Sequence, residues 1–502
     1  MSPSERTGLL AGSVNESEPT GPNSAESPKD NAGGTNNSTR LTIFIAYLGA
    51  FLASSDESVF HELAKGPWLV TGYNLGYCIA LPINGTLADT WGRKLSMLIG
   101  YSFFGLGCLI SSTSPAMTGL VAGRFVSGAG AAGMTITISI IITDLAAPRD
   151  VALLRSYTNV VAMIGRGLGA PLGSIAFAGQ LPLIVLCLVL SRVYFPNQPR
   201  ESAQSQGSHG GKVKQLDYIG IATFATAILA LLLAMTVAGQ DGGKMSHIYL
   251  WMVTFALAAT LFVFNEILWA RRPLVPLSLV TKGIGQYWLV ELVLFCGRTG
   301  LVATITQYLS QVKRVPEATA SMFLVFCTMG LAVSSMASGF AIQRTKRYKK
   351  RGIYAAVISV ISSILLFFSW HFDHPVAESL LVIPMSTPIG IIISGEFIGM
   401  SNRAPPEILA SSVGAYYLSQ QLGSIMGAAM GPLIVRTGFK YDIAGRLNEQ
   451  VETEYVNTLP EDIQRVVRSS LGYGYQFVPV LATVTVALYV PSLVLTREQS
   501  VE

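Results

Sequence analysis

After residue 40 the chain is a series of long apolar runs separated by short polar stretches. A helix needs about 20 mostly apolar residues to cross a bilayer. Fourteen runs approach or exceed this length, so the pattern predicts an all-α protein that crosses the membrane repeatedly. The predicted spans cover residues 41–58, 66–87, 95–113, 117–143, 156–174, 179–195, 218–238, 248–269, 283–309, 318–343, 352–370, 378–400, 408–435 and 473–496.

The composition agrees with a membrane protein. Charged residues make up 13% of the 502 residues, whereas about 25% is usual in soluble domains. The five cysteines lie in apolar runs without paired or metal-ligand spacing, so neither a metal site nor a disulfide framework is expected. We find no nucleophile–base pair or phosphate-binding loop, and therefore expect no enzyme activity and no cofactor. The net charge of +5 is spread over loops and does not indicate nucleic-acid binding.

Basic residues predict the orientation, because they are retained in short cytosolic loops. With the N-terminus in the cytosol, cytosolic segments hold 22 of the 34 Lys and Arg residues. Both termini are therefore expected in the cytosol. The strongest basic cluster, 344–351, occupies the position in the second half that Arg93 and Lys94 occupy in the first. This correspondence predicts two halves of common ancestry, a frequent design among transporters.

These patterns divide the chain into two six-helix bundles joined through an inserted helix pair, and we expect a monomer in the bilayer. The predicted divisions are a disordered cytosolic tail (1–40), an N-terminal bundle (41–195), a cytosolic linker (196–217), the inserted pair (218–269), a C-terminal bundle (270–496) with a lumenal loop (436–472), and a short cytosolic tail (497–502).

A polar turn between the second and third spans carries the most specific motif. In Gly85-Thr-Leu-Ala-Asp-Thr-Trp-Gly-Arg-Lys94, the glycines allow close helix approach, and Asp89 can pair with a helix N-terminus, which favours a carboxylate. On these grounds alone the motif is also explained as an orientation signal. The turn resembles the signature of the major facilitator superfamily, which implies the major facilitator fold and a gating role between the two halves. The matching residues are Gly85, Leu87, Ala88, Asp89, Gly92, Arg93 and Lys94.

Ionisable residues at membrane depth are costly and are functional candidates for that reason. They are Asp56, Glu57, Arg124, Arg166, Glu291, Arg298 and Glu396. In the superfamily that the motif resembles, the helices carrying the four acids line a central cavity. Acids there would select cations, and a proton and a cationic substrate could compete for one carboxylate. The alternative is that some of these acids only pair with the arginines.

Two glycine-rich stretches resemble further superfamily motifs. Arg124, in Gly123-Arg-Phe-Val-Ser-Gly-Ala-Gly, corresponds to an arginine that couples proton movement; close helix packing with one paired arginine is the alternative. The stretch 165–174 resembles an antiporter motif, although Ala170 separates Gly169 from Pro171 and Ser174 replaces a usual glycine. Its matching residues are Gly165, Arg166, Gly169, Pro171 and Gly173.

Aromatic and amide side chains add candidates for the substrate site. Tyr416 and Tyr417 in span 13 could hold an ammonium group by cation–π attraction, and Asn159 in span 5 is a further polar candidate. Ordinary helix packing explains the tyrosines equally well.

A narrower resemblance, to fungal vacuolar basic amino acid transporters, rests on the stretches 47–57, 66–74, 180–183 and 399–405. It implies proton antiport of Lys, Arg and His across the vacuolar membrane by alternating access. The alternatives are a plasma-membrane drug or siderophore exporter and, less favoured, a non-transporting sensor. The tail residues Glu5, Leu9 and Leu10 form an acidic dileucine pattern, which predicts an adaptor coat as partner and agrees with a vacuolar location.

Two regions are shorter than this resemblance implies. Only 12 positions separate Asp56 from Trp68, so span 1 is short. Residues 156–191 must hold spans 5 and 6 in 36 positions. At about 1.5 Å per residue this leaves almost no outer loop between the two spans.

Overall fold

The computed structural model describes residues 37–63, 67–194, 217–239, 245–270, 274–275, 283–372, 376–405, 408–446 and 461–495. No strand occurs within these ranges. Ten of the described helical segments are long and apolar enough to cross a membrane. The expectation of an all-α, polytopic membrane protein is therefore confirmed. The predicted sorting residues Glu5, Leu9 and Leu10 lie outside the described residues.

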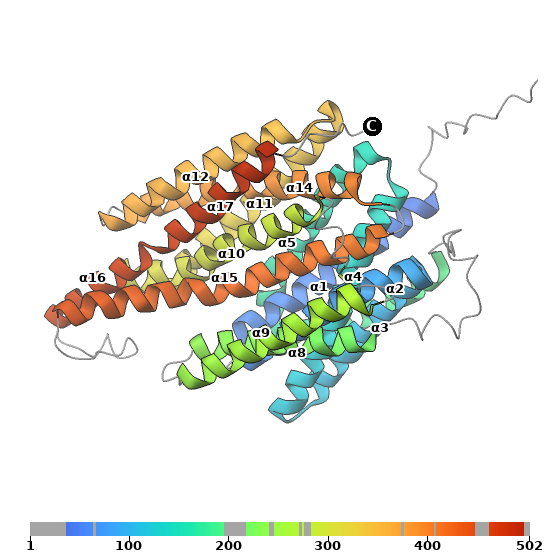
Figure 1. Ribbon diagram of the computed structural model, residues 1–502, viewed down its shortest axis with the longest axis horizontal. Helices are drawn as coiled ribbons and strands as arrows, with labels where there is room; N and C mark the ends of the chain where they lie inside the picture. The colour runs from blue at the N-terminus through green and yellow to red at the C-terminus, as the bar shows by residue number, and fades with distance from the viewer. Residues whose placement is uncertain are drawn as a thin grey trace, which may run out of the picture.

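Two helical bundles and an intervening helix pair make up the structure (Figure 1). The N-terminal bundle comprises α1 (Asn37–Leu63), α2 (Pro67–Trp91), α3 (Arg93–Thr113), α4 (Met117–Leu145) and α5 (Pro148–Tyr194). The pair consists of α8 (Tyr218–Gly239) and α9 (Met245–Leu268). The C-terminal bundle comprises α10 (Gly285–Gln307), η2 (Tyr308–Val312), α11 (Glu317–Thr345), α12 (Lys349–His371), η3 (Val376–Leu381), α13 (Val382–Ser386), α14 (Ile389–Arg403), α15 (Leu409–Arg446), α16 (Glu461–Tyr475) and α17 (Val478–Leu495).

Glycines bring helices of one bundle into backbone contact. A Cβ atom added at Gly130 of α4 would overlap the backbone of Phe104 in α3, and one added at Gly128 would overlap the Tyr73 carbonyl in α2. Gly423 of α15 meets α10 in the same manner. These contacts explain the glycines near Arg124 by close packing, as small residues do in membrane helices.

The first arm of α5 runs alongside α1. Tyr47 donates a hydrogen bond from its hydroxyl to the Leu154 carbonyl at 3.0 Å. Farther along both helices, Gly165 lies so close to α1 that an added Cβ would be 2.7 Å from the Phe51 carbonyl oxygen. Residue numbers rise together in the two contacts, so this arm is parallel to α1.

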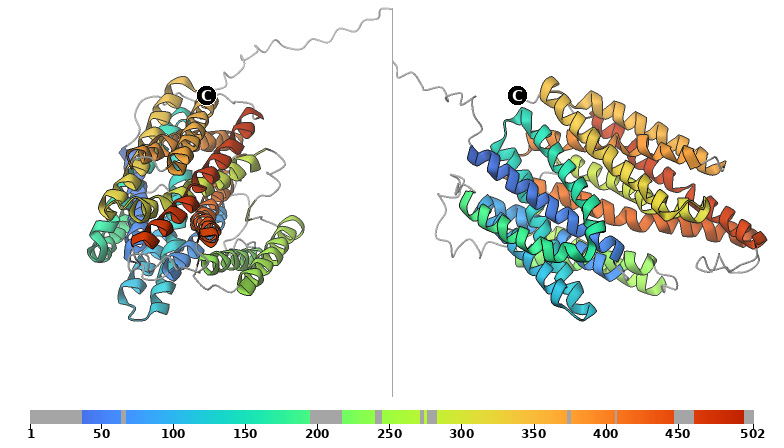
Figure 2. Two further views of the ribbon diagram at one scale, coloured as in Figure 1. Left: turned by 90° about the vertical axis from the view of Figure 1, so that its left-hand side faces the viewer. Right: turned by 180° about the vertical axis from the view of Figure 1, so that it is seen from behind.

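The second arm of α5 runs in the opposite direction to the first. The Cys108 thiol of α3 lies 3.8 Å from Oε1 of Gln180, and Gly105 faces Ile184, so this arm is antiparallel to α3. Helices α1 and α3 both run antiparallel to α2 and are therefore parallel to each other. An arm parallel to α1 and an arm antiparallel to α3 run in opposite directions, so the chain reverses between the arms (Figure 2). The predicted spans 5 and 6 correspond to these arms. The difference from the expectation is that helical turns continue through the reversal, because the chain has no residues to spare for a loop.

The predicted lumenal loop 436–472 is partly helical. Helix α15 continues to Arg446, and α16 starts at Glu461 and packs lengthwise against it, with Gly438 close to Gly474 (Figure 1). In α16 every fourth residue, Val467, Leu471 and Tyr475, is buried. This helical period of apolar residues gives α16 one face that packs on its neighbours.

Candidate functional site

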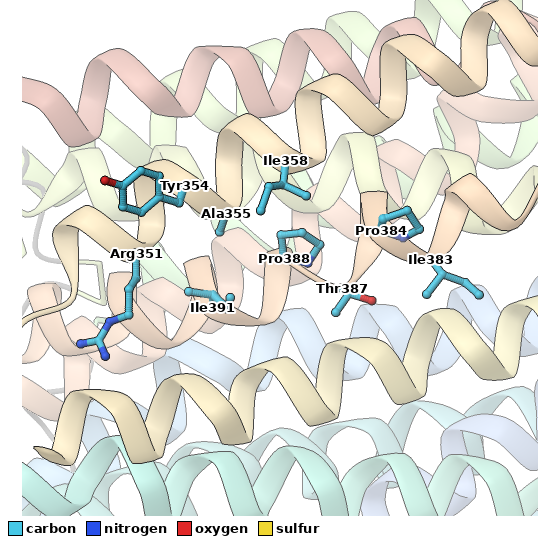
Figure 3. Close-up of a pocket in the computed structure, with 9 residues that line it drawn as sticks. All are labelled: Arg351, Tyr354, Ala355, Ile358, Ile383, Pro384, Thr387, Pro388 and Ile391. Atoms are coloured by element: carbon cyan, nitrogen blue, oxygen red, sulfur yellow. The ribbon is translucent and has the colours of Figure 1, made fainter. Parts of the chain in front are cut away.

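A groove with a volume of about 520 Å³ lies between α12 and the segment α13–α14 (Figure 3). Its walls are almost entirely apolar, with Arg351 at one end, and none of the predicted acidic residues lines it. Tyr354 and Ile358 on its α12 side are largely exposed. The groove therefore lacks the negative charge that a cationic substrate needs.

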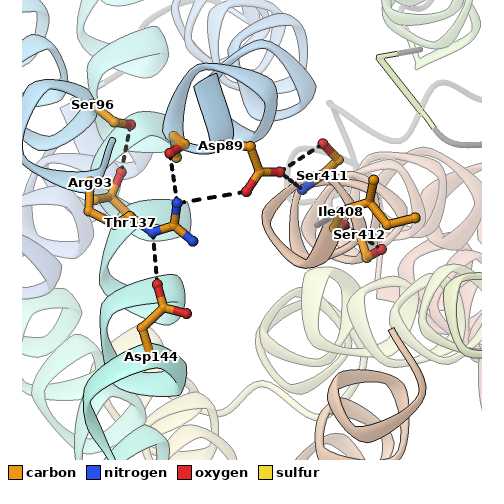
Figure 4. A network of polar contacts seen from close by, with 9 residues as sticks. Asp89, Arg93, Ser96, Thr137, Asp144, Ile408, Ser411 and Ser412 are labelled. Atoms are coloured by element: carbon orange, nitrogen blue, oxygen red, sulfur yellow. Dashed lines mark hydrogen bonds and ion pairs between the residues drawn. The ribbon is translucent and has the colours of Figure 1, made fainter. Parts of the chain in front are cut away.

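The motif between α2 and α3 joins the two bundles (Figure 4). Asp89 Oδ2 accepts hydrogen bonds from the backbone nitrogen and the hydroxyl of Ser411, each 3.2 Å long. Arg93 lies 3.8 Å from Asp89 Oδ1 and bonds Asp144 through Nε at 2.8 Å. Because Ser411 is in the first turn of α15, Asp89 binds the positive end of that helix. The motif thus holds the end of α2 against the start of α15.

The rest of the motif shapes the turn. Gly92 has a φ of 91°, a conformation that glycine adopts without steric cost. An added Cβ at Gly85 would be 3.0 Å from the Ala410 carbonyl, so a larger residue there would separate α2 from α15. Lys94 is half-buried and has no ion pair within the described ranges.

A second contact between the bundles lies on α5 and α11. Gln343 donates to Asp150 at 2.8 Å, Ser156 donates to the Ser335 carbonyl at 2.7 Å, and Asn159 donates to the Ser335 hydroxyl at 2.8 Å. Asn159 therefore joins the two bundles in this conformation and is already engaged by a protein partner.

The contacts between the bundles extend from the Asp89 end toward the middle of the membrane. Asn74 on α2 accepts a hydrogen bond from Gln421 at 2.9 Å. Gln421 lies 12 residues beyond the start of α15, or about 18 Å along the helix. The described structure is thus a conformation closed at the Asp89 end.

Asp56 and Arg124 form an ion pair inside the N-terminal bundle. Arg124 Nη1 is 2.6 Å from Asp56 Oδ2, and the side chains are 2% and 1% exposed. The guanidinium also lies over the Tyr73 ring, 4.4 Å from its centroid. For Asp56 the structure therefore favours pairing with an arginine over an open cation site. The side chain of Glu57 lies outside the described part of the structure.

Glu291 and Glu396 lie together in the C-terminal bundle, on α10 and α14. Glu291 is fully buried, has no ion pair among the described residues, and has Tyr416 as its hydrogen-bonding neighbour. Tyr416 stands beside Glu291, and its hydroxyl lies 3.3 Å from the Ile393 carbonyl. Glu396 is hydrogen-bonded to Tyr489 and acts electrostatically on Glu291. Two of the four predicted acids are thus brought together.

Arg155 of α5 completes this cluster from the other bundle. Its Nη2 donates to the Tyr417 hydroxyl at 3.1 Å, and its guanidinium lies 3.2 Å from the Phe397 ring centroid. It also acts electrostatically on Glu291. The sequence pattern does not single out Arg155, because the predicted span starts at residue 156 and leaves Arg155 in a cytosolic loop, whereas the structure places it inside α5. The available signal was its position after Val151-Ala-Leu-Leu154, an apolar run that places it inside the helix.

The antiporter-like stretch is only partly described. Gly165 packs against α1, and Arg166 is exposed on α5, where it acts electrostatically on Arg298 of α10. Gly169, Pro171 and Gly173 belong to α5, but their surroundings lie outside the description. In the part of the chain that is described, no group of three or more His, Cys, Asp or Glu residues could hold a metal ion.

Comparison with protein families gives one extended match. A model described as Major Facilitator Superfamily matches residues 40–428. Among solved structures, the human organic anion transporter MFSD10 aligns with a TM-score of 0.58 at 13% identity, covering 89% of this chain and 99% of that one. The proton:xylose symporter XylE aligns with a TM-score of 0.55 at 14% identity, covering 93% and 97%. These likenesses show the fold.

Curated relatives include transporters of amino acids and of drugs. The vacuolar membrane amino acid uptake transporter fnx2 of Schizosaccharomyces pombe is 24% identical, over 86% of this chain and 80% of that protein. The vacuolar basic amino acid transporter 1 of Saccharomyces cerevisiae is 25% identical, over 61% of this chain and 57% of that protein. The multidrug resistance protein fnx1 of Schizosaccharomyces pombe is 21% identical, over 86% and 87%.

Proposed function

Because the chain belongs to the Major Facilitator Superfamily and is a membrane transporter rather than an enzyme, we propose that it exchanges basic amino acids for protons across the vacuolar membrane. Lysine, arginine and histidine are the proposed substrates. In this proposal both termini and the Asp89 end face the cytosol, which the distribution of basic residues supports.

Glu291 is the observation that carries this proposal. A bare carboxylate that is fully buried costs several kcal/mol unless it is protonated or paired. Glu291 has no described ion pair, yet it lies where Arg155 of one bundle meets Tyr416 of the other. A proton or a cationic substrate would each satisfy it. Binding one would exclude the other, and this competition couples the two fluxes.

Glu396 and the neighbouring tyrosines would support the exchange. Glu396 adds a second carboxyl group in the same bundle, and Tyr416 and Tyr417 offer aromatic faces and hydroxyls to a cation. In the conformation closed at the Asp89 end, protons would enter from the lumen and release the substrate. Separation of Asp89 from Ser411 would then open the cluster to the cytosol.

Relatives of low sequence identity support the proposed substrate class. Two of them are named as vacuolar amino acid transporters. The second candidate function is drug export at the plasma membrane, which the similarity to the multidrug resistance protein fnx1 favours. The dileucine pattern of the N-terminal tail, which we expect to bind an adaptor coat, supports the vacuolar location.

Uptake of labelled arginine into vacuolar vesicles energised with ATP tests the proposal. Uptake should require the protein, stop with an uncoupler, and fall to background in Glu291→Gln, because a neutral amide cannot alternate between a proton and a cation. Glu266→Gln is the matched control: Glu266 is buried too, but it accepts a hydrogen bond from the Val275 backbone nitrogen at 2.7 Å. Undiminished, uncoupler-sensitive uptake by Glu291→Gln would refute the role of Glu291. Drug sensitivity on deletion, without arginine uptake, would favour the second candidate.

A further inference from the structure

Arg298 lies on the same face of α10 as Glu291. Arg298 comes seven positions after Glu291. Seven positions bring a side chain back to within about 20° of the same direction and about 10.5 Å farther along the helix. An acid and a base thus project from one helix, two turns apart.

Arg298 differs from other arginines at membrane depth in its partners. Arg124 is paired with Asp56 and Arg155 bonds Tyr417. Within the described ranges, Arg298 has no hydrogen bond and no ion pair; its Nε is shielded from solvent, and its guanidinium lies 5.8 Å from the Phe295 ring centroid. Arg298 as a whole is half-buried, but shielding part of a charged group without a partner is costly.

The electrostatics around Arg298 increase this cost. The charged residue that acts on it most strongly is Arg166, which comes from α5 of the other bundle and has the same sign. Arg166 is exposed, whereas the Nε of Arg298 is shielded from solvent. An anion placed between the two side chains would be attracted by both cations, and the planar guanidinium can hold a carboxylate through two parallel hydrogen bonds.

We propose that Arg298 binds the α-carboxylate of the substrate while Glu291 receives its cationic end. This inference rests on the proposed function and adds the residue that would recognise the carboxylate of a basic amino acid, and so distinguish it from an organic cation without one. The side chains of lysine and arginine separate the terminal cation from the carboxylate by several bonds, as the spacing of the two sites on α10 requires. A cation without a carboxylate would leave Arg298 unsatisfied and facing Arg166.

The test compares arginine with agmatine, which is arginine without its carboxylate. Purified wild type, Arg298→Gln and Arg298→Lys are reconstituted into vesicles with an acidic lumen, and uptake of both labelled compounds is measured. Arg314→Gln, in an exposed turn, is the control. Wild type should prefer arginine. Arg298→Gln should weaken the apparent affinity for arginine about tenfold or more, as loss of a charge-assisted contact does, without weakening that for agmatine. Arg298→Lys should recover part of the loss.

Binding to the detergent-purified protein provides a second readout that does not need proton coupling. Arginine should raise the thermal unfolding temperature of wild type more than agmatine does, and this difference should vanish in Arg298→Gln. If Arg298→Gln reduced the thermal stabilisation by arginine and by agmatine equally, or reduced neither, the role of Arg298 would be overturned. Selective binding without proton-driven uptake would refute the proposed exchange but support the site. If neither compound binds or is transported, both proposals are wrong.

Discussion

Neutralising Asp56 should destabilise the protein strongly, because it would leave Arg124 charged inside the N-terminal bundle. The two side chains are 1% and 2% exposed, and Arg124 Nη1 lies 2.6 Å from Asp56 Oδ2. Removing one member of a buried pair typically costs about 3–5 kcal/mol. We expect Asp56→Asn to lower the free energy of unfolding by an amount in this range. The measurement is reversible denaturation of the purified protein in mixed detergent micelles.

A double-mutant cycle separates the pair from the individual residues. Asp56→Asn combined with Arg124→Gln should be less destabilising than the sum of the single changes, because no uncompensated charge remains. Asp144→Asn is the exposed control: Asp144 also bonds an arginine at 2.8 Å, but its side chain is 32% exposed, so a loss of about 0.2–1 kcal/mol is expected. If Asp56→Asn cost no more than Asp144→Asn, the ion pair would not be the structural element inferred here.

Two further predictions concern packing and location. Gly130→Ala should lower the free energy of unfolding by about 1–3 kcal/mol, because its Cβ would overlap the Phe104 backbone; Gly445→Ala, with no atom near the added methyl, should not lower it in the same denaturation assay. Replacing both Leu9 and Leu10 by Ala should move a fluorescently tagged protein from the vacuolar membrane to the cell surface, since the proposed adaptor signal is lost. Unchanged vacuolar fluorescence would exclude that signal.

The sequence predicts the fold class well because membrane spans are encoded locally. Long apolar runs identify helices such as α4 and α12 without knowledge of their neighbours. The Gly85–Lys94 motif was found in the same way, and the structure shows that Asp89 reaches the other bundle at Ser411. Glu291 and Glu396 could be singled out because an acid in an apolar run is conspicuous.

Features that depend on tertiary contacts could not be predicted in this way. The pairing of Asp56 with Arg124 joins residues 68 positions apart, and composition alone left it as one alternative for that acid. Arg155 falls outside the predicted span because apolar periodicity does not define where a helix begins. The reversal within α5 and the packing of α16 on α15 likewise follow from neighbouring helices and not from local periodicity.

Proton movement driven by arginine tests the central claim most directly. Wild type and Glu291→Gln are reconstituted into vesicles with an acidic interior and a lumenal pH indicator, and arginine is added outside. The account predicts that the lumen of wild-type vesicles becomes more alkaline as arginine enters, and that Glu291→Gln vesicles show no such change. Arginine accumulation in wild type without any change in lumenal pH, or proton movement that survives Glu291→Gln, would contradict it.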